Sequence, residues 1–395
     1  MKILFIQGGS RLKQDTEGNW YTDPNFNDDV WKRYVDLADS FTILLRKEST
    51  VYPADMAKER FNKMLDDPRI RIVPLPDFAE TKASMINPLT YKKIKNIITE
   101  EVRNVDKCFI RSVSPYSWYT YQACKKFNKK YLFEACDFAR ESYTFHSSLG
   151  KLIAGRMEKW HTVMAHDAAC ATYVTGKALQ ERYPCASGKM LSCSNVQLPK
   201  LDDNVLSARL KKIENKHVDD IIVIGTAAFL DVKWKGQDLV IKALGVLKKK
   251  GITNIRFEMI GIGTGNYLRK IAKENNVLDQ VKIIGPVRHD QVFPWLDSLD
   301  LYIQSSYQEG LCRSVIEALS RALPVICSDT GGNYELVEQK YIFDCGDYNT
   351  LSEMIEKIIT DMSNQAKRNF NTAKKYEKSI LDARRKAFFK EFIKM

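Results

Sequence analysis

Residues 301–333 read LYIQSSYQEGLCRSVIEALSRALPVICSDTGGN, which predicts a strand, a loop, a helix and a second strand in close succession. Leu301–Gln304 is a short apolar run, and Pro324-Val325 opens another. Gly310 interrupts the polar loop and frees the backbone before a helix that we expect to begin near Leu311. Strand, helix and strand in this order are the repeating unit of a parallel α/β sheet.

Two carboxylates surround the start of this predicted helix. Glu309 and Glu317 lie eight positions apart, a little over two helical turns, so we expect both on one side. Free N–H groups at a helix N-terminus attract phosphate, and a neighbouring carboxylate accepts hydrogen bonds from sugar hydroxyls. A solvated helix face gives the same spacing, so the pair alone is weak evidence.

The order of these parts resembles the retaining glycosyltransferases of family 4. In that family a Glu, seven residues and a second Glu precede a small residue, a turn and a Pro-Val strand. The similarity continues through Glu317-Ala318, Pro324-Val325 and Gly331-Gly332. The resemblance implies transfer of a sugar from a nucleoside diphosphate donor.

The resemblance also implies a role for each residue of the motif. Glu309 would contact sugar hydroxyls beside the anomeric carbon, and Glu317 would hold ribose hydroxyls. The N–H groups of Gly310 and Leu311 would face the diphosphate. Arg313 follows the Glu-Gly-Leu-x-Arg form of some relatives and would add positive charge, although a surface ion pair is an equal alternative.

A second element of the resemblance lies earlier in the chain. Residues 220–225 predict a buried strand, and Lys235-Gly236 leads into a helical pattern. This element is similar to the family's Lys-Gly pair, whose lysine neutralises the donor diphosphate. The family has an Arg a few residues earlier, where this chain has residues 227–229 (Ala-Ala-Phe), so Lys233 is the candidate for the missing charge. The alternative is that Lys233 and Lys235 are ordinary loop lysines.

Three further strands complete this half of the chain. The strand at 255–260 precedes a glycine-rich turn, Gly261–Gly265, which is either a tight strand-to-helix turn or a phosphate contact. The strand at 281–284 leads to Val287, where the family holds the nucleobase through backbone groups. Leu301–Gln304 delivers Ser306 at its carboxyl end, where ligands bind in open α/β sheets.

The first half of the chain repeats the alternation of strands and helices. Its strand candidates are 3–7, 42–45, 70–75, 107–111, 131–135 and 171–175. We therefore predict an α/β protein of two doubly wound Rossmann-like domains, which the resemblance places face to face across a cleft in the GT-B arrangement. The expected domains are an acceptor-binding domain at 1–198, a nucleotide-sugar domain at 199–372 and a C-terminal helix at 373–395 that packs back on the first domain. The hinge is expected near residues 198–204, where Pro199 and a polar cluster break both patterns. Beyond Asn364 the sequence predicts one long helix with an apolar face, and the alternative to packing on the first domain is a free amphipathic membrane helix.

The amino-terminal domain has fewer features of the family. Gly8-Gly9 matches the glycine turn that lets phosphates approach the backbone after the first strand, although a hairpin or simple loop would need the same residues. Many relatives have a His at the end of the fifth strand that touches the donor sugar, and here Asp137 is the candidate for that catalytic role. The alternative is that Asp137 caps the next helix.

Composition limits the remaining possibilities. No apolar run approaches the roughly 18 to 20 residues needed to span a bilayer, and the first residues lack a secretory signal, so we expect a cytoplasmic protein. The chain has nine cysteines and no Cys-x-x-Cys pair, which favours reduced thiols over disulfides or a zinc site. We expect neither a cofactor nor a bound metal, because Lys235 and a helix end would meet the phosphate charge.

Positive charge is concentrated in one part of the chain. Residues 81–200 carry 19 basic and 9 acidic residues, with Trp118, Tyr121 and Trp160 among the lysines. This combination favours an anionic membrane surface at the inner face of the membrane, although scattered solubilising lysines give the same count. Nucleic acid is a poor alternative, because no nucleic-acid-binding motif accompanies the charge.

The sequence therefore predicts a retaining glycosyltransferase. It would move a hexosyl group from a nucleoside diphosphate sugar to a hydroxyl of a surface glycan or of a lipid-linked acceptor. The alternative is an inactive relative of the same fold that serves as a nucleotide-binding or scaffold protein, as the missing Arg and His would allow.

Overall fold

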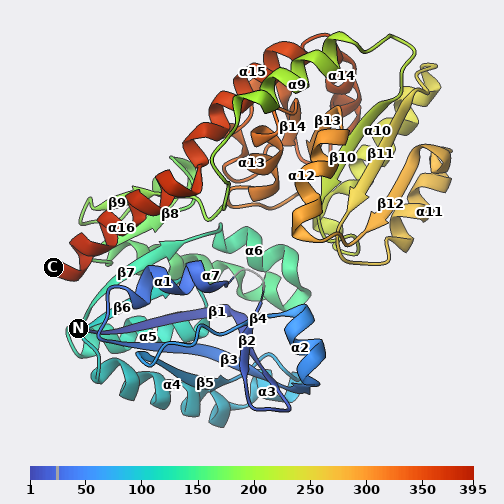
Figure 1. Cartoon of the computed structure of the whole chain (residues 1–395). Coiled ribbons are helices and arrows are strands. Elements are labelled where there is room, and N and C mark those ends of the chain that lie inside the picture. Colours follow the sequence, from blue (N-terminus) through green and yellow to red (C-terminus); the bar gives the residue numbers. More distant parts are fainter. Residues whose placement is uncertain (24–25) are drawn as a thin grey trace. The chain divides into compact units, whose positions relative to one another are not determined.

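The computed structural model describes residues 1–23 and 26–395 and divides into two compact units (Figure 1). Unit 1 comprises Met1–Tyr173, Gln180–Ser192 and Arg384–Met395, and unit 2 comprises Val174–Leu179 and Cys193–Ala383. The chain therefore enters unit 2 first at Val174, returns to unit 1 at Gln180 and enters unit 2 again at Cys193, a few residues before the expected hinge at 198–204. We describe each unit by itself.

Unit 1 is built on one sheet. Its strands are β1 (Lys2–Asp15), β2 (Trp20–Thr22), β3 (Ser40–Tyr52), β4 (Asn62–Lys63), β5 (Ile70–Pro76), β6 (Lys107–Arg111), β7 (Lys130–Ala135), β8 (Cys170–Tyr173) and β9 (Met190–Ser192). The strands in the order β5-β3-β1-β6-β7-β8-β9 are parallel, and β2 pairs antiparallel with both β1 and β4. The chain thus winds outward from β1 in both directions, as a doubly wound sheet does.

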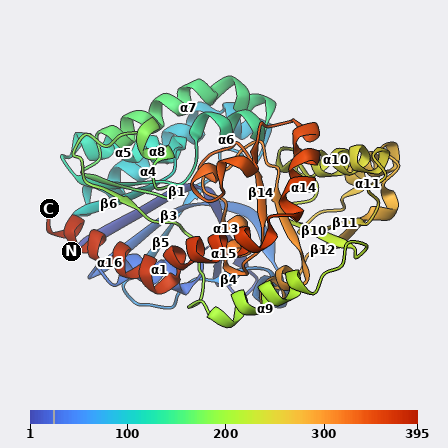
Figure 2. The ribbon, with the colours of Figure 1, turned by 90° about the horizontal axis from the view of Figure 1, so that it is seen from above.

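Helices cover both faces of this sheet (Figure 2). One face carries α1 (Asp28–Val35) and the end of α16 (Lys378–Lys394), and the other carries α4 (Pro88–Arg103), α5 (Pro115–Lys126) and α7 (Ser148–His166). Shorter helices lie in the loops, namely α2 (Ala54–Arg60), α3 (Lys82–Ile86), α6 (Ala139–His146) and α8 (Ala178–Arg182). Because both faces are covered, the central strands are continuous apolar runs.

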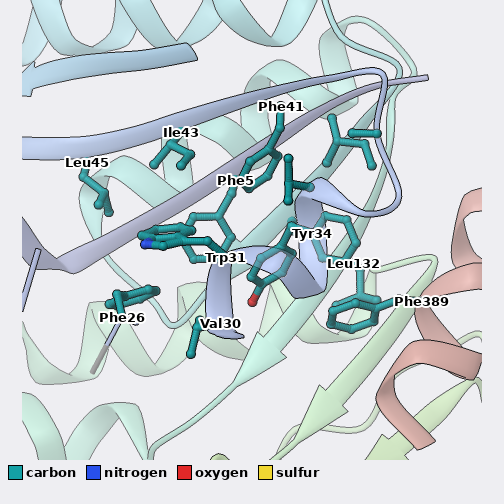
Figure 3. Close-up of a cluster of buried hydrophobic side chains, with 14 of the residues drawn as sticks. Phe5, Phe26, Val30, Trp31, Tyr34, Phe41, Ile43, Leu45, Leu132 and Phe389 are labelled. Carbon is teal, nitrogen blue, oxygen red and sulfur yellow. The ribbon is translucent and has the colours of Figure 1, made fainter. Parts of the chain in front are cut away.

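Aromatic side chains fill the core between the sheet and α1 (Figure 3). Trp31 packs edge-on against Phe5 with ring centroids 5.6 Å apart, and Tyr34 stacks on Phe41 at 5.8 Å. Phe389 of α16 stacks on Tyr34 at 5.7 Å. The last turns of α16 are therefore part of the core of unit 1.

Unit 2 has the second sheet, in which every strand pair is parallel. Its strands are β10 (Ile222–Ala227), β11 (Ile255–Ile260), β12 (Val281–Gly285), β13 (Leu301–Gln304), β14 (Val325–Ser328) and β15 (Ile342–Phe343), in the order β12-β11-β10-β13-β14-β15. Among its helices, α10 (Gln237–Lys249) contacts α11 (Asn266–Glu274) and α14 (Tyr348–Ile359), while α15 (Met362–Ala373) contacts α9 (Asp203–Glu214) and α13 (Arg313–Ser320). The helix α12 (His289–Ser298) precedes β13.

The predicted fold class is confirmed, but two local expectations are wrong. The chain after residue 364 is not one long helix, because Glu377 adopts an extended conformation after the 3-10 turn Lys374–Tyr376 and separates α15 from α16. Lys378 donates its N–H to the Leu198 carbonyl at this break. Consequently Phe370 packs in unit 2, whereas Phe392 packs in unit 1.

Gly8 and Gly9 do not form a turn after the first strand. They lie inside β1, where the register with β3 shifts between Ile6 and Arg11. A Cβ on Gly8 would lie 2.3 Å from the Ser114 hydroxyl, so this position admits only glycine. The pair therefore forms a bulge that lets α5 approach the strand.

None of the helices in the described part of the chain combines the length and apolar character that a bilayer crossing requires.

Candidate active site

The predicted site residues of unit 2 gather where the strand order reverses. The chain leaves β10 toward β11 and leaves β13 toward β14, so the carboxyl ends of β10 and β13 flank a topological switch point. Lys235 ends the 3-10 helix Lys233–Lys235 after β10, and Glu309 lies in the loop after β13. Ligands bind at this position in open α/β sheets because two adjacent loops diverge there.

Lys235 and Glu309 form an ion pair. The Lys235 Nζ lies 2.7 Å from Glu309 Oε1, and the two side chains are only 16% and 12% exposed. The same ammonium lies 4.5 Å from the centroid of the Trp234 ring, within the range of a cation–π contact. The sequence predicted that both residues contact one ligand; that contact stays a prediction, and the structure shows that they contact each other.

Gln304 orients the carboxylate of this pair. Its Nε2 donates to Glu309 Oε1 at 3.3 Å and to the Ser306 hydroxyl at 2.7 Å. Its Oε1 accepts from the hydroxyls of Tyr302 at 3.1 Å and Ser314 at 3.2 Å. Gln304 is almost fully buried, and buried amides with every group paired hold their neighbours in one geometry.

The two loops that carry the ion pair are joined by their backbones. Gly236 has φ +70°, and a Cβ there would lie 1.9 Å from the Ser305 carbonyl oxygen. The Ser305 hydroxyl donates to the Gly236 carbonyl at 2.7 Å, and the Tyr307 N–H donates to the Trp234 carbonyl at 2.8 Å. The Lys-Gly element thus requires glycine for close approach to the loop of Glu309.

A third loop closes on the same point. Gly331 has φ +55°, and a Cβ on it would lie 2.2 Å from the Glu309 carbonyl oxygen. The Gly332 N–H donates to the Gly310 carbonyl at 2.7 Å. The glycine pair of the sequence motif therefore packs beneath the backbone of Glu309 and Gly310.

The helix α13 begins later than the sequence suggested. Its first residue is Arg313 and its N-cap is Cys312, whose side chain makes no capping hydrogen bond to the helix backbone. Glu309 therefore lies in the loop before the helix, and Glu317 lies on the helix with a half-buried side chain. Leu311 is buried beside this N-terminus.

The remaining predicted residues of unit 2 lie around this centre. Lys233 and Arg313 are exposed, and Val287 is half-buried in the loop after β12. Ser306 is buried, and its carbonyl accepts from the Ser328 hydroxyl at 2.6 Å. Ser306 therefore also supports the loop.

In the glycine-rich turn at Gly261–Gly265, backbone N–H groups donate hydrogen bonds to a carboxylate of the same chain. Asp231 accepts from the N–H groups of Thr264 at 2.7 Å and Gly265 at 2.9 Å. These hydrogen bonds hold the pKa of Asp231 below its usual value. The turn thus serves as a tight strand-to-helix connection whose free amides are capped internally.

Asp137 lies in unit 1, just after the carboxyl end of β7. Its Oδ1 is buried and has no hydrogen-bond partner among the described residues, and burial raises the pKa of Asp137 to about 6. The alternative role as a helix cap is wrong, because the N-cap of α6 is Phe138. A carboxyl group with a raised pKa and an open acceptor is typical of functional sites.

Two residues that the sequence analysis missed support the site. Gln304 could have been noticed as a polar residue at the end of an apolar strand. Glu335 accepts from the backbone N–H groups of Gly176, Lys177 and Ala178, the last two at 3.0 and 2.8 Å. It therefore connects the segment Val174–Leu179 to the 3-10 turn that follows Gly331-Gly332. No local sequence pattern predicts this contact, because the partners are far apart in the sequence.

The described residues contain no cluster of three or more His, Cys, Asp or Glu side chains that could hold a metal ion. Cys312, beside the ion pair, is buried, and burial raises the pKa of its thiol to about 12. The thiol is therefore neutral and serves for packing.

Comparison with known proteins defines the class to which this site belongs. Residues 208–376, which include Lys235, Glu309 and Glu317, match the family model of the glycosyl transferases group 1. Protein CapJ from Staphylococcus aureus is 30% identical over 362 residues, which cover 91% of this chain and 86% of CapJ. The chain therefore belongs to the group 1 glycosyl transferases.

Other relatives and solved structures agree with this assignment. The capsular polysaccharide biosynthesis glycosyltransferase CapM of Staphylococcus aureus is 27% identical over 199 residues, 47% of this chain and 49% of CapM. HepE from Anabaena, solved with UDP-glucose, matches with a TM-score of 0.62 at 16% identity and covers 99% of this chain and 100% of its own. WaaG, a glycosyltransferase involved in lipopolysaccharide biosynthesis, matches with a TM-score of 0.59 at 14% identity, covering 98% of each chain. At these identities the likeness establishes the GT-B class of fold.

Proposed function

We propose that the protein is a retaining family 4 enzyme. It transfers a hexosyl group from a nucleoside diphosphate sugar to a hydroxyl of a surface glycan or of a lipid-linked acceptor. The observation that carries the proposal is the Lys235–Glu309 pair at the switch point of unit 2, 2.7 Å apart and shielded from solvent. A cation beside a carboxylate suits a donor that presents phosphate and hydroxyls side by side.

Donor binding would rearrange this pair. The diphosphate would form an ion pair with Lys235 and accept hydrogen bonds from the N–H groups of Gly310 and Leu311. Glu309 would then lose its contact with Lys235 and be able to accept hydrogen bonds from sugar hydroxyls. Gln304 holds Glu309 in place through this exchange, since its contacts to the loop do not involve Lys235. Glu317 would hold the ribose. The solved complex of HepE with UDP-glucose supports a donor of this class.

Peripheral contacts would complete the donor site. The backbone at Val287 would meet the nucleobase, while Lys233 and Arg313, both exposed, would add positive charge around the phosphates. Gly8-Gly9 and Asp137 belong to unit 1, and Asp137 would contact the transferred sugar there. We expect turnover without a divalent metal, because protein cations and backbone N–H groups meet the phosphate charge.

The reaction requires no separate base. The bond between the anomeric carbon and the phosphate oxygen breaks, and a bond to the acceptor oxygen forms on the same face. Because the new bond forms on the face that the diphosphate leaves, the configuration is retained, and the departing phosphate oxygen takes the acceptor proton. Electrostatic stabilisation of the leaving diphosphate by Lys235 would make the largest contribution to catalysis.

The names of the relatives favour a cell-surface glycan as product. They include glycosyltransferases of capsular polysaccharide, teichuronic acid and O-antigen biosynthesis. We place the reaction in the cytoplasm, at the inner face of the membrane, where a lipid-linked acceptor would be presented.

A transfer assay with a panel of nucleoside diphosphate hexoses tests the proposal. We expect one donor to be consumed, with NMR of the product showing the donor's anomeric configuration and with full activity in EDTA. Glu309→Gln should lower turnover roughly a hundredfold or more, while Glu353→Gln, at an exposed carboxylate of α14, should leave it unchanged. Inversion of configuration, or an active Glu309→Gln variant, would overturn the mechanism. Absence of binding by every nucleotide would favour the scaffold alternative.

A further inference from the structure

The exposed apolar side chains of unit 1 are concentrated at one edge of its sheet. Most of them lie at or after the carboxyl ends of β3, β5 and β7, namely Val51, Met56, Ile86, Leu89, Phe145, Leu149 and Leu152. The most exposed are Leu152 at 83%, Ile86 at 81% and Leu89 at 72%. In Figure 1, α2, α3 and α6 all lie toward the side of unit 1 that is away from the labelled N-terminus.

Aromatic contacts join the first turns of α4 and α5 at this edge. Phe78, which follows β5, packs against Tyr91 of α4 with ring centroids 5.5 Å apart and against Tyr116 of α5 at 5.2 Å. The Tyr116 hydroxyl donates to the Pro76 carbonyl at 2.8 Å. Ile86 and Leu89 therefore lie beside the start of α5.

Backbone contacts extend this edge to α6 and α7. The Tyr143 hydroxyl of α6 donates to the Val113 carbonyl, just before α5, at 3.2 Å. Gly150, in the first turn of α7, packs so closely on α6 that a Cβ there would lie 2.2 Å from the Tyr143 carbonyl oxygen. Leu149 and Leu152 thus belong to the same edge as Ile86 and Leu89.

The helix α7 has two opposite faces. Its buried face is formed by Ala154, Met157, His161 and Met164, and its exposed face by Leu149, Leu152, Arg156 and Lys159. The spacings of three and four residues are the same on both faces, so each face runs straight along the helix. Apolar side chains at the start of α7 are thus followed by cations one turn later.

The charged residues in both apolar segments are all basic. Residues 81–99 and 142–157 contain no Asp or Glu. Lys92 and Lys93 follow Leu89 in the first segment, and Lys151 and Arg156 lie close to Leu152 in the second. All four of these cations are exposed. An exposed apolar segment with flanking cations and no acids suits the interface of a bilayer that contains anionic lipids.

The aromatic residues of the basic region do not form this surface. Trp118 and Trp160 stack on each other with ring centroids 4.8 Å apart, and the Tyr121 hydroxyl donates to Asp167 at 2.8 Å. These rings join α5 to α7. The exposed leucines, rather than the tryptophans, are therefore available for a partner.

We propose that the apolar edge, defined as Ile86, Leu89, Leu149 and Leu152, docks on a lipid bilayer containing anionic lipids. Lys92, Lys93, Lys151 and Arg156 contact the headgroups while the four apolar side chains enter the interface. The purpose of this docking rests on the proposed function, since a lipid-linked acceptor resides in the same bilayer. The docking itself is measured without any glycosyl transfer.

Vesicle co-sedimentation of the full chain tests the proposal. We expect sedimentation with vesicles of phosphatidylcholine and phosphatidylglycerol and weak sedimentation with phosphatidylcholine alone. Leu149→Ser with Leu152→Ser should weaken partitioning roughly tenfold. Lys151→Gln with Arg156→Gln should weaken it by about fivefold per cation. The matched control is Val218→Ser with Ile221→Ser, which removes two exposed apolar side chains of unit 2 and should change nothing.

The results that would contradict the docking surface differ from those that would contradict the proposed function. Failure of the folded chain to bind either vesicle, or equal loss in the control variant, would overturn the docking surface. So would a leucine variant that keeps full vesicle binding and loses thermal stability, because the leucines would then be covered by protein. Transfer to a detergent-dispersed acceptor is measured separately. Loss of transfer with normal vesicle binding would overturn the proposed function and leave the docking surface intact.

Discussion

The two units share a doubly wound sheet, yet the candidate polar side chains after the strands of unit 2 are paired differently from those of unit 1. In unit 2, Lys235, Glu309 and Gln304 are joined by contacts of 2.7 to 3.3 Å. In unit 1, Asp137 Oδ1 and Arg46 Nε are buried and have no hydrogen-bond partner among the described residues. The cluster of Lys235, Glu309 and Gln304 is therefore paired within itself, whereas these two groups of unit 1 are not. Unpaired buried atoms are not confined to unit 1, since Gln237 Oε1 and Asn333 Oδ1 of unit 2 also lack a partner among the described residues.

The largest effect should come from breaking the pair in unit 2. We expect Lys235→Ala and Glu309→Gln each to lower kcat/KM roughly a hundredfold or more, because each removes a group that contacts the donor in the proposed mechanism. The double variant should lose far less than the product of the two, since residues in direct contact act as a unit. Steady-state kinetics of all four proteins measures this coupling.

A surface pair provides the control for this cycle. Lys248 lies 3.2 Å from Asp279, but Asp279 is 72% exposed, and Lys248 is in the last turn of α10, the helix that follows Lys235-Gly236. Lys248→Ala should leave kcat/KM unchanged, because exposed pairs contribute little. Independent, multiplying effects of Lys235→Ala and Glu309→Gln would show that the ion pair is not a functional unit.

The next largest effect should come from the glycine beneath Glu309. Gly331→Ala places a Cβ 2.2 Å from the Glu309 carbonyl oxygen at a φ of +55°, so the loop must move. We expect a stability loss of about 2–4 kcal/mol and a fall of about tenfold or more in donor affinity. Chemical denaturation and calorimetric titration with the donor measure the two effects.

A control substitution at Gly188 distinguishes the effect of backbone strain at Gly331 from the effect of the steric clash with Glu309. It has φ +69°, but nothing lies within 4 Å of its Cβ position. Gly188→Ala should therefore cost only about 1 kcal/mol, the penalty for a left-handed residue with a side chain, and should leave donor affinity unchanged. Equal effects of the two substitutions would show that Gly331 has no role in placing Glu309.

The difference between the units also explains what the sequence could predict. The pattern around Glu309 and the Lys235-Gly236 pair are short and local, and each carries its own glycine at the point of close approach. Parallel strands bring such loops to one edge, so the meeting of Lys235 and Glu309 follows from the strand order. Gln304 was missed although its partners Tyr302, Ser306, Glu309 and Ser314 are close in sequence, because the spacing of these residues does not show that their side chains converge on one amide.

Unit 1 was predicted less well for a physical reason. In the sequence Gly8-Gly9 has the pattern of a turn, but because the strand pairs with β3, β1 continues past these two residues to Asp15. The chain after residue 364 has helical periodicity throughout, and the break at Glu377 depends on a contact with Leu198 far away in the sequence. Tertiary contacts override local pattern in both cases.

A smaller effect is expected at Asp137 in unit 1. Its pKa of about 6 lies above the ordinary value of 3.8, so the folded state favours the protonated form. The group's contribution to stability is present below the ordinary pKa and is lost as the pH rises through 6. Asp137→Asn should therefore raise the stability by about 1–2 kcal/mol at pH 8, and the gain should shrink as the pH falls from 6 toward 4.

Activity distinguishes a functional Asp137 from a buried defect. We expect Asp137→Asn to lower transfer about tenfold while it raises the melting temperature, because functional groups are often kept at a cost in stability. Asp66→Asn, at an exposed carboxylate of the same unit, should change neither quantity. A stabilised variant with full activity would remove Asp137 from the proposed site.

The smallest effect is expected at Glu335, whose substitution tests whether its carboxylate holds the segment Val174–Leu179 in place. Glu335 accepts three backbone N–H groups at the start of α8, so its charge and both oxygens contribute. Glu335→Gln keeps the shape and loses the charge, and should cost about 1 kcal/mol. Hydrogen exchange at the amides of Lys177 and Ala178 should then quicken about fivefold, while the amides of β10 keep their protection. Equal acceleration in both places would mean that Glu335 supports unit 2 as a whole. No acceleration would mean that other contacts hold the segment, such as the Leu179 N–H bond to the Thr175 hydroxyl.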